Sequence, residues 1–590
     1  MQSETKQCQN CKNDFTIESD DFAFYEKMKV PPPTFCPECR MARRLNWRNH
    51  RTLFKRSCDL CNKNIVSTFN KNLPFPVYCN SCYYSDSWDP ESYAQEYDFS
   101  KPFFEQWRIL WNKVPKPAIF INTNSKNVEY ANVVIDSSNV YLGYSITRSE
   151  NVLYSESIDN CKDMMDSYMS IEGCDTCYYS QGRSDYGCRF VSQCAGCIDC
   201  DFCFDCVNCR DCFMSWGLRN KKYMFRNKQL TKEEYEIAIS KENIVSRKNV
   251  DRLKDEWKNM INTKAIHQYS RIVSCQNCTG NYMKNCKDVN YSYNIYDCEN
   301  SKYCIRAFNS KDSYDVYGLG DSELINECVG CSFGASNNKY SFYCVGNTNI
   351  DYTFYCDNSD NLFACFGLRK KKNCILNKQY SKEEYIEMVE KIKKHMNDMP
   401  YLDKKGNEYK YGEYLPIDFS PYSYNETLVF DFLPKSKSEA ISQGYVWHNL
   451  ENKNHKVDYL YSEIPDDLKD VDDSITQKVL ECKHMERETD CEHQCTQAFK
   501  ITQDEMNFYK KMNLPLPDMC PNCRHYERLD IFTNPVKFYN RECDCGKGKF
   551  ENTTEHNHEG GVCNNNFISF INPTDTKIVY CESCYQKEII

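Results

Sequence analysis

The sequence predicts a mainly β protein, in which a duplicated parallel β-solenoid with a twelve-residue period lies between two cysteine-rich modules. Cysteine supplies 40 of the 590 residues and follows two patterns. At both ends it occurs in C-x₂-C pairs, the spacing with which proteins hold a tetrahedral zinc ion. In the middle it recurs on a twelve-residue repeat, and a short fixed repeat indicates coils that stack on one another.

These patterns divide the chain into eight segments. In order they are a double zinc-ribbon module (1–84), a helical linker (85–120), β-solenoid A (121–230), a connecting helix (231–265), β-solenoid B (266–380), a helix (381–399), a connector (400–480) and a second double zinc-ribbon module (481–590).

Composition limits the classes of protein to consider. The net charge of −10 does not describe a polycation that binds nucleic acid with its whole surface. The polar start, MQSETKQCQNCK, lacks the apolar core of a secretory signal, and no run of about 18 apolar residues predicts a membrane span. We therefore expect a cytoplasmic protein, whose thiols stay reduced and bind zinc.

The N-terminal module carries two cysteine quartets, each built from two C-x₂-C pairs and a spacer. Two such knuckles supply four soft ligands to Zn²⁺ without strain. The predicted ligands are Cys8, Cys11, Cys36 and Cys39, and then Cys58, Cys61, Cys79 and Cys82.

The C-terminal module repeats this plan. FYEKMKVPPPTFCPECR (24–40) aligns with FYKKMNLPLPDMCPNCR (508–524), and VYCNSCY (77–83) aligns with VYCESCY (579–585). Its predicted ligands are Cys491, Cys495, Cys520 and Cys523, and then Cys543, Cys563, Cys581 and Cys584. The four quartets predict about four zinc ions per chain.

An insertion separates Cys543 from Cys563 and contains Cys545, His556 and His558. Any one of these three could replace Cys543 or Cys563 as a ligand. Cys482 and His484 lie just upstream of the module and are left over by the pairing.

The zinc ions are predicted to be structural. The quartets leave no open coordination position and have no neighbouring acid or base, both of which a catalytic zinc needs. A structural zinc ion contributes roughly 10–16 kcal/mol of apparent binding free energy to the fold around it.

One motif occurs twice, at 8–44 and at 491–528, and reads C-x₂-C-x₃-F-x-I…F-Y-x-K-M…P-x₂-C-P-x-C-R-x₃-R. In the second copy the first knuckle reads C-x₃-C. The motif resembles the trcl-type zinc-ribbon family. The whole arrangement is similar to large bacterial proteins with such ribbons at both ends, some of which carry a CaiB/BaiF CoA-transferase label. The resemblance implies zinc binding, and no residue here supports CoA-transferase chemistry.

The middle of the chain can be written in rows of twelve from residue 125: SKNVEYANVVID, SSNVYLGYSITR, SENVLYSESIDN and onward. Columns one, four, seven and ten are small or apolar and are predicted to face inward. Column three is Asn or Asp in most rows, which suits a turn where the side chain bonds backbone. GLRNKKYMFRNKQLTKEEY (217–235) and GLRKKKNCILNKQYSKEEY (367–385) end the two halves alike, 150 residues apart, and indicate a duplication.

Two features of this repeat have more than one interpretation. The cysteines from Cys194 to Cys212, spaced by three, all fall on inward columns, where thiols pack as small apolar groups. Additional metal binding and disulfides within a coil are the alternatives. Columns six and eight are rich in aromatic residues, which either lie under other parts of the chain or form an exposed strip for a partner or a glycan.

Three helices are predicted beside the repeats. SKPFFEQWRILWNKVPKP is amphipathic and ends at prolines, and the segments 231–262 and 381–397 begin with capping boxes at Thr231 and Ser381.

The sequence favours a non-catalytic zinc protein that acts as a scaffold or a binding platform, with a protein partner or self-association. It contains no P-loop, nucleophile elbow or H-E-x-x-H motif. The alternative is nucleic-acid binding by a basic run without acids, formed by Arg40, Arg43, Arg44, Trp47, Arg48, Arg51, Lys55 and Arg56. This run could instead be a solvated face or pair with the acidic segment 463–473. A glycan-binding or glycan-acting β-solenoid is the second alternative.

Overall fold

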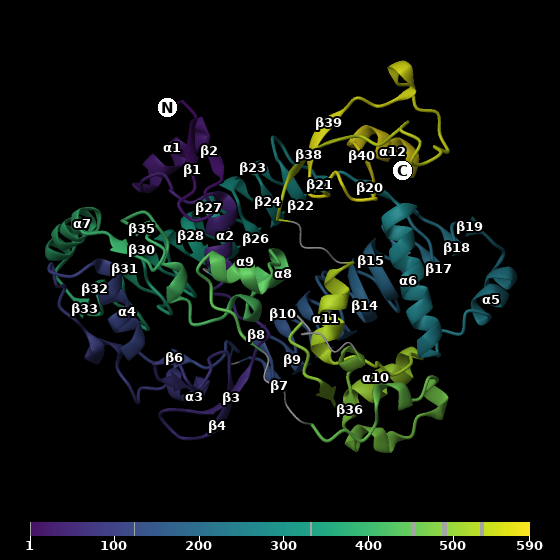
Figure 1. Ribbon diagram of the computed structural model, residues 1–590, viewed down its shortest axis with the longest axis horizontal. Coiled ribbons are helices and arrows are strands. Elements are labelled where there is room, and N and C mark those ends of the chain that lie inside the picture. Colours follow the sequence, from purple (N-terminus) through teal and green to yellow (C-terminus); the bar gives the residue numbers. More distant parts are fainter. Residues whose placement is uncertain (1, 123, 331–332, 450–454, 487–492, 532–535) are drawn as a thin grey trace.

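Two runs of short parallel strands form the centre of the computed structural model, and the cysteine-rich ends lie over them (Figure 1). The structure describes residues 2–122, 124–330, 333–449, 455–486, 493–531 and 536–590. Its sheets are mostly parallel, and helices cover parts of their surface. The expected β-rich class with cysteine groups at both ends is therefore observed.

The first run of strands, here called the first stack, comprises β7 (Lys126–Glu129), β8 (Asn132–Ile135), β9 (Ser138–Tyr141), β10 (Tyr144–Thr147), β11 (Glu150–Leu153), β12 (Glu156–Asp159), β13 (Lys162–Met165), β14 (Asp175–Arg183), β15 (Arg189–Ala195), β16 (Asp201–Phe204), β17 (Arg210–Phe213), β18 (Lys222–Phe225) and β19 (Lys228–Gln229). Val152 pairs in parallel with Val140 on one side and with Met164 on the other, each twelve positions away.

The second stack comprises β21 (Ile272–Val273), β22 (Gly280–Lys284), β23 (Lys287–Asn290), β24 (Ser292–Tyr296), β25 (Glu299–Lys302), β26 (Ile305–Phe308), β27 (Lys311–Gly320), β28 (Glu323–Val329), β29 (Ser336–Lys339), β30 (Thr348–Asp351), β31 (Asp360–Phe363), β32 (Lys372–Ile375) and β33 (Lys378–Gln379). Ile295 pairs with Ala307, and Ile350 pairs with Leu362, again twelve positions away.

The chain turns at every third residue of each stack. Asn127, Tyr130, Val133 and Asp136 all have φ between 48° and 56°, and this left-handed conformation continues along both stacks. Such conformations are costly outside glycine and persist only where the surroundings fix them. Asn127 Nδ2 donates to Asn139 Oδ1 at 2.8 Å, so a ladder of amides fixes one corner. The Asn and Asp side chains therefore bond one another along the stack, where the sequence analysis expected bonds to backbone.

A second ladder fixes the inner corners and uses serine and cysteine alike. Ser149 Oγ donates to the carbonyl of Thr147 at 2.7 Å and accepts the amide of Cys161, twelve positions later, at 3.1 Å. The thiol of Cys161 in turn donates to the carbonyl of Asp159. This position requires a small side chain with one donor and one acceptor, and both residue types provide them.

The cysteines from Cys194 to Cys212 follow the same rule. All are buried, and the thiols of Cys203 and Cys206 lie 3.4 and 3.5 Å from the carbonyl oxygens two residues before them. Burial raises the pKa of Cys203 and Cys206 well above the usual thiol value. Hydrogen bonds from neighbouring thiols lower the pKa of Cys200 and Cys209. The described cysteines include no disulfide pair. This geometry favours core packing over the alternatives.

Two helices cover each stack, and one helix of each pair is exchanged. The helix that precedes the first stack covers the second stack, and the helix that precedes the second stack covers the first. α4 (Phe103–Lys113) lies before the first stack and packs on the second, where Trp107 donates to the carbonyl of Tyr352 at 3.0 Å. α6 (Arg247–Thr263) lies before the second stack and packs on the first, where Trp257 meets Phe202. α5 (Lys232–Ser240) and α7 (Lys382–Asp398) follow the first and second stacks and pack on β18 and β32.

Two expectations about the helices can be compared with the structure. The capping boxes at Thr231 and Ser381 are present, and their hydroxyls accept the amides of Glu234 and Glu384. The single helix expected over 231–262 is instead two, α5 and α6. Asn243 adopts a left-handed conformation between them, and Ser246 caps the second helix, so the chain breaks there.

Most side chains of the aromatic columns lie under the chain's own elements, and Tyr130 is exposed. Tyr144, Tyr168, Tyr340 and Tyr352 are almost completely buried. The two stacks also contact each other, because Tyr293 of the second donates to the sulfur of Met169 in the first at 3.7 Å. In Figure 1 their last strands, β19 and β33, lie at opposite sides of the molecule.

The remaining elements belong to the ends and the connector. The N-terminal module contains β1 (Glu4–Gln7), β2 (Asp14–Ile17), α1 (Ser19–Met28), α2 (Pro37–Leu45), β3 (Phe54–Ser57), β4 (Asn64–Ser67), β5 (Val77–Tyr78) and α3 (Asn80–Tyr83). The linkers contain β6 (Lys116–Pro117), β20 (Ile266–Gln268), β34 (Tyr401–Leu402), β35 (Glu408–Tyr409), α8 (Leu428–Phe432) and α9 (Lys437–Ser442). The C-terminal module contains β36 (Leu480–Glu481), β37 (Ala498–Phe499), α10 (Gln503–Met512), α11 (Pro521–Leu529), β38 (Tyr539–Glu542), β39 (Asn566–Ser569), β40 (Ile578–Tyr580) and α12 (Glu582–Ile589).

Candidate metal centres

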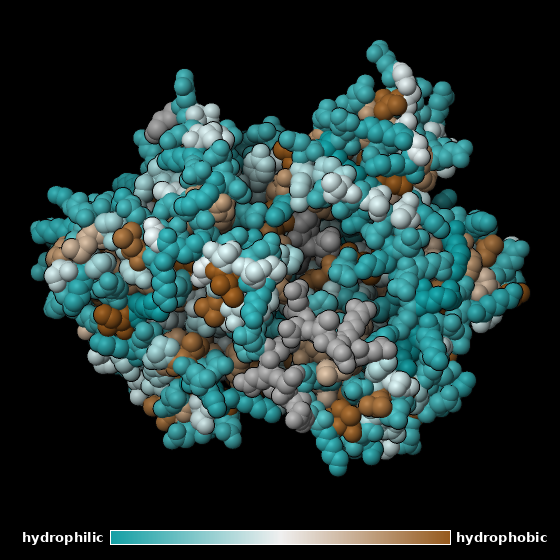
Figure 2. Space-filling model, viewed as in Figure 1, coloured by the Kyte–Doolittle hydropathy of each residue, from teal (hydrophilic) through white to brown (hydrophobic). Residues whose placement is uncertain are grey.

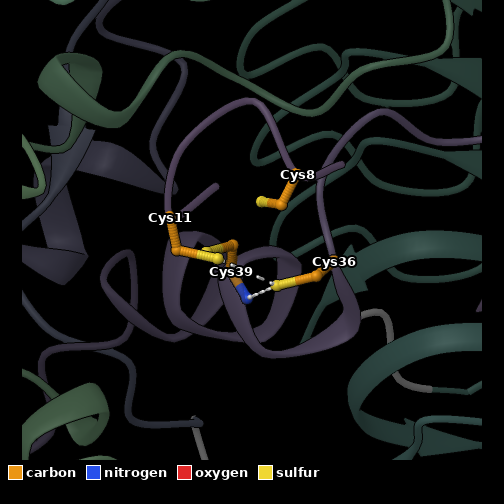
Figure 3. Close-up of side chains that lie close together, drawn as sticks. All are labelled: Cys8, Cys11, Cys36 and Cys39. Carbon is orange, nitrogen blue, oxygen red and sulfur yellow. Dashed lines mark hydrogen bonds between the residues drawn. The ribbon is translucent and has the colours of Figure 1, made fainter. Parts of the chain in front are cut away.

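Four groups of four cysteines bring their sulfurs together in the two end modules. Within each group every sulfur lies within 4.8 Å of the others. The groups are Cys8, Cys11, Cys36 and Cys39; Cys58, Cys61, Cys79 and Cys82; Cys482, Cys495, Cys520 and Cys523; and Cys543, Cys563, Cys581 and Cys584. Figure 3 shows the first group, whose four side chains converge from two separate turns of the chain.

The distances between the sulfurs fit a tetrahedral metal ion. Zn–S bonds of about 2.3 Å at tetrahedral angles place two sulfurs about 3.8 Å apart. The sulfurs of Cys11 and Cys36 are 3.7 Å apart, and those of Cys61 and Cys79 are 3.9 Å apart. In the C-terminal module, Cys495 and Cys520 are also separated by 3.9 Å. A disulfide would require about 2.05 Å, so these spacings suit ligands of a shared ion.

All four groups are built in the same way. The first cysteine directly follows a strand, the second stands three residues before the paired strand, and the third caps a helix. In three groups the amide of the third cysteine donates to the first sulfur at 3.2 Å: Cys79 to Cys58, Cys520 to Cys482, and Cys581 to Cys543. A short hairpin and a helix N-terminus thus present the ligands.

Hydrogen bonds among the sulfurs lower the pKa of some of the thiols, and the thiolate is the form that binds metal. Hydrogen bonds from the thiols of Cys36 and Cys39 hold the pKa of Cys8 far below its usual range. A hydrogen bond with the Cys543 thiol lowers the pKa of Cys581 to about 3. Each of these groups therefore holds at least one sulfur that ionises readily.

The third group differs from the predicted quartet in one residue. Cys491, predicted from the C-x₃-C spacing, lies outside the described residues. Cys482, which the pairing left over, occupies the first position: it directly follows β36, and its sulfur lies 3.8 Å from that of Cys523. In the fourth group Cys543 and Cys563 are both present, so no residue of the insertion replaces either one.

The basic run does not form a free surface. Arg40, Arg43, Arg44, Trp47 and Arg48 are each at most 6% exposed. Their carboxylate partners come from the second stack and the connector, and not from the acidic segment 463–473. Arg40 pairs with Asp315, Arg43 with Glu327 and Glu413, and Arg44 with Asp315 and Glu327.

The rest of the run is paired as well, apart from one lysine. Arg48 Nε donates to His50 at 2.9 Å, Arg51 lies 3.7 Å from Glu156, and Arg56 pairs with Asp59 at 2.7 Å. Lys55 alone in this run is exposed. The solvated-face interpretation is therefore wrong for most of the run, and its guanidinium groups are used inside the molecule.

The C-terminal module contacts the first stack through equivalent ion pairs between arginines and a buried carboxylate. Arg524 and Arg528 of α11 occupy the places of Arg40 and Arg44 in α2, and both pair with Asp166 at 3.1 and 2.5 Å. Asp166 is completely buried between β13 and β14.

Comparison with known proteins does not assign the chain to a family: no family model matches it, and no curated protein matches it. Within the described residues, no helix has the length and apolar character needed to cross a bilayer.

Proposed function

We propose that the protein is a non-catalytic scaffold, whose four tetracysteine groups bind structural zinc and lock two β-solenoids together. The observation that carries this proposal is the crossed attachment of the metal modules. The N-terminal module holds the second stack through Arg40 and Asp315, whereas the C-terminal module holds the first through Arg528 and Asp166.

The second ribbon of each module supports the same role. Arg369 of the second stack donates to the carbonyl of Tyr83 at 2.7 Å, one residue after Cys82. Arg219 of the first stack donates to the hydroxyl of Tyr585 at 2.7 Å, one residue after Cys584. Folding of all four ribbons around their ions therefore positions residues that hold the two stacks.

We also propose that each stack is a parallel β-solenoid with twelve-residue coils and that the second arose by duplication of the first. The twelve-residue offsets of the paired strands support the coils. The equivalence of Trp107 and Trp257, 150 residues apart and in exchanged helices, supports the duplication.

The other functions receive less support from the geometry. A nucleic acid would find only Lys55 of the basic run exposed. A glycan would find most of the aromatic columns covered, and a cavity of about 40 Å³ beside Asp166 and Arg524 has room for only a few water molecules. The face in Figure 2 is mostly hydrophilic, with small scattered apolar patches. A protein partner or a second copy, and a cytoplasmic location, remain the expectations.

Native mass spectrometry of the full chain before and after treatment with a chelator tests the proposal. We expect at least four zinc ions per chain, and their removal should expose the interiors of the end modules to hydrogen exchange. A chain that is isolated without metal and keeps the same exchange pattern would refute the structural role of zinc.

A further inference from the structure

We propose that the insertion between Cys543 and Cys563 builds a fifth zinc site, and that the sulfur of Cys584 bridges it to the zinc ion of the fourth group. The inference rests on the proposed zinc binding of that group. The site consists of Cys545, His556, His558 and Cys584, whose ligand atoms all lie within 4.8 Å of one another.

The distances fit a metal with mixed ligands. Zn–S bonds of about 2.3 Å and Zn–N bonds of about 2.0–2.1 Å place sulfur and nitrogen about 3.6 Å apart in a tetrahedron. The sulfur of Cys545 lies 3.4 Å from His556 Nδ1 and 3.5 Å from His558 Nε2. The sulfur of Cys584 lies 3.3 Å from the same His558 Nε2.

The second nitrogen of His556 has the partner that a metal ligand needs. His556 Nε2 lies 3.1 Å from Glu588 Oε2, and the side chains of both are nearly completely buried. Histidines that bind zinc commonly donate their other N–H to a carboxylate, which fixes the tautomer and the ring orientation. Glu588 is therefore placed to make Nδ1 of His556 the metal-binding nitrogen.

The helix α12 explains why the two sites are linked. Cys584 and Glu588 are four residues apart and so share one face of this helix. The same face thus carries the shared sulfur and the partner of His556. On the other side, Asn552 Nδ2 donates to the Cys545 sulfur at 3.3 Å and holds it toward the site.

The N-terminal module provides an internal comparison. Its corresponding pair, Cys58 and Cys61, is separated by two residues, so it lacks every ligand that the insertion supplies. Since Cys543 and Cys563 both belong to the fourth group, the insertion residues are not substitutes for a missing ligand. The three ligands in the insertion and Cys584 make a second set of four.

The test is the number of zinc ions on the full chain, measured by native mass spectrometry after purification in excess zinc. The wild-type chain should carry five ions, and the His556→Ala/His558→Ala variant should carry four. A His448→Ala/His455→Ala variant, changed at two histidines outside these groups, should keep five. Four ions on the wild-type chain would overturn the inference and leave the proposed function standing, whereas a chain without zinc would overturn both.

Two further measurements test the carboxylate and the bridge. Glu588→Gln should weaken binding of one ion by about 10–100-fold in a chelator titration and leave the other four unchanged. After exchange of zinc for Co²⁺, the bridging sulfur should couple two ions magnetically. The electron paramagnetic resonance intensity per cobalt should therefore be lower in the wild-type chain than in His556→Ala/His558→Ala. Equal intensities would show that Cys584 is not shared.

Discussion

Replacement of Asp166 by alanine should release the C-terminal cysteine-rich module from the first stack and leave the N-terminal module in place. Asp166 is completely buried and is 2.5 Å from Arg528 and 3.1 Å from Arg524. Arg524 keeps a second carboxylate, Glu505, at 3.0 Å, but Arg528 keeps only the carbonyl of Tyr154. Breaking such a buried pair leaves a charge without a partner and costs about 3–5 kcal/mol.

The assay is hydrogen exchange of the full chain, followed by mass spectrometry of the peptides from α11 and α2. A cost of about 3–5 kcal/mol corresponds to an increase of roughly two to four orders of magnitude in the opening constant. We expect this increase in α11 of Asp166→Ala and no change in α2. Asp315→Ala, the matched variant of the other half, should affect α2 and spare α11.

Two outcomes would refute this reasoning. Unchanged exchange of α11 would show that the ion network does not hold the module, and equal increases in both helices would show that the two attachments are not separate. The quadruple variant Asp166→Leu/Arg524→Met/Arg528→Met/Glu505→Gln removes all four charges of the network together. It should recover much of the lost protection, because apolar groups of similar volume can replace a buried ion network.

Three other predictions concern the thiols and the buried histidines. In the native chain a chelator should expose cysteines such as Cys36 to alkylation and leave Cys203 of the first stack unmodified. Peptide mass spectrometry measures this labelling, and alkylation of Cys203 after chelation would contradict its burial in the core. Cys161→Ser should change the free energy of unfolding by less than about 1 kcal/mol, because Ser149 fills the equivalent position twelve residues earlier. Cys161→Leu should cost about 1–3 kcal/mol by overpacking. Equal losses of the two variants in denaturant titrations would show that this position does not require a small side chain. Burial and the charge of Arg48 lower the pKa of His50 to about 4, below its value of about 6.5 in the unfolded chain, so its contribution is complete above pH 6.5 and is lost as the pH falls toward 4. Unfolding in saturating zinc should show a weaker loss of stability over this range in His50→Gln, and an unchanged slope would exclude His50 as its source.

The sequence predicts the metal groups because ligand spacing is a local property. The two N-terminal groups follow from cysteine pairs alone, and the fourth follows from the alignment of the C-terminal module with the N-terminal one. The third was missed in one position because its hairpin is opened between Cys482 and Cys495, so the knuckle spacing disappears. The structure shows the equivalence: β36 ends directly before Cys482 as β1 ends directly before Cys8, and β37 begins three residues after Cys495. The fourth hairpin is opened in the same way between Cys543 and Cys563.

The burial and ion pairing of the basic run could not be predicted from its own residues. A cluster of arginines without acids suggests a surface for anions, because charge is usually solvated. Here the compensating carboxylates, Asp315 and Glu327, come from strands more than 270 residues further along the chain. Only the docking of α2 onto β27 and β28 reveals that the charges neutralise one another.

The crossed attachments also determine which parts of the chain depend on each other. The first stack is completed by α6 and by the C-terminal module, and the second by α4 and by the N-terminal module. Each physical unit therefore contains segments from both halves of the sequence, so a cut between the two halves would leave two stacks without their partners. β36 begins some 250 residues after the first stack ends at β19, so the C-terminal ribbons can dock only long after the strands of the first stack have been made. Under the proposed function, zinc binding by these ribbons is then the step that closes the molecule.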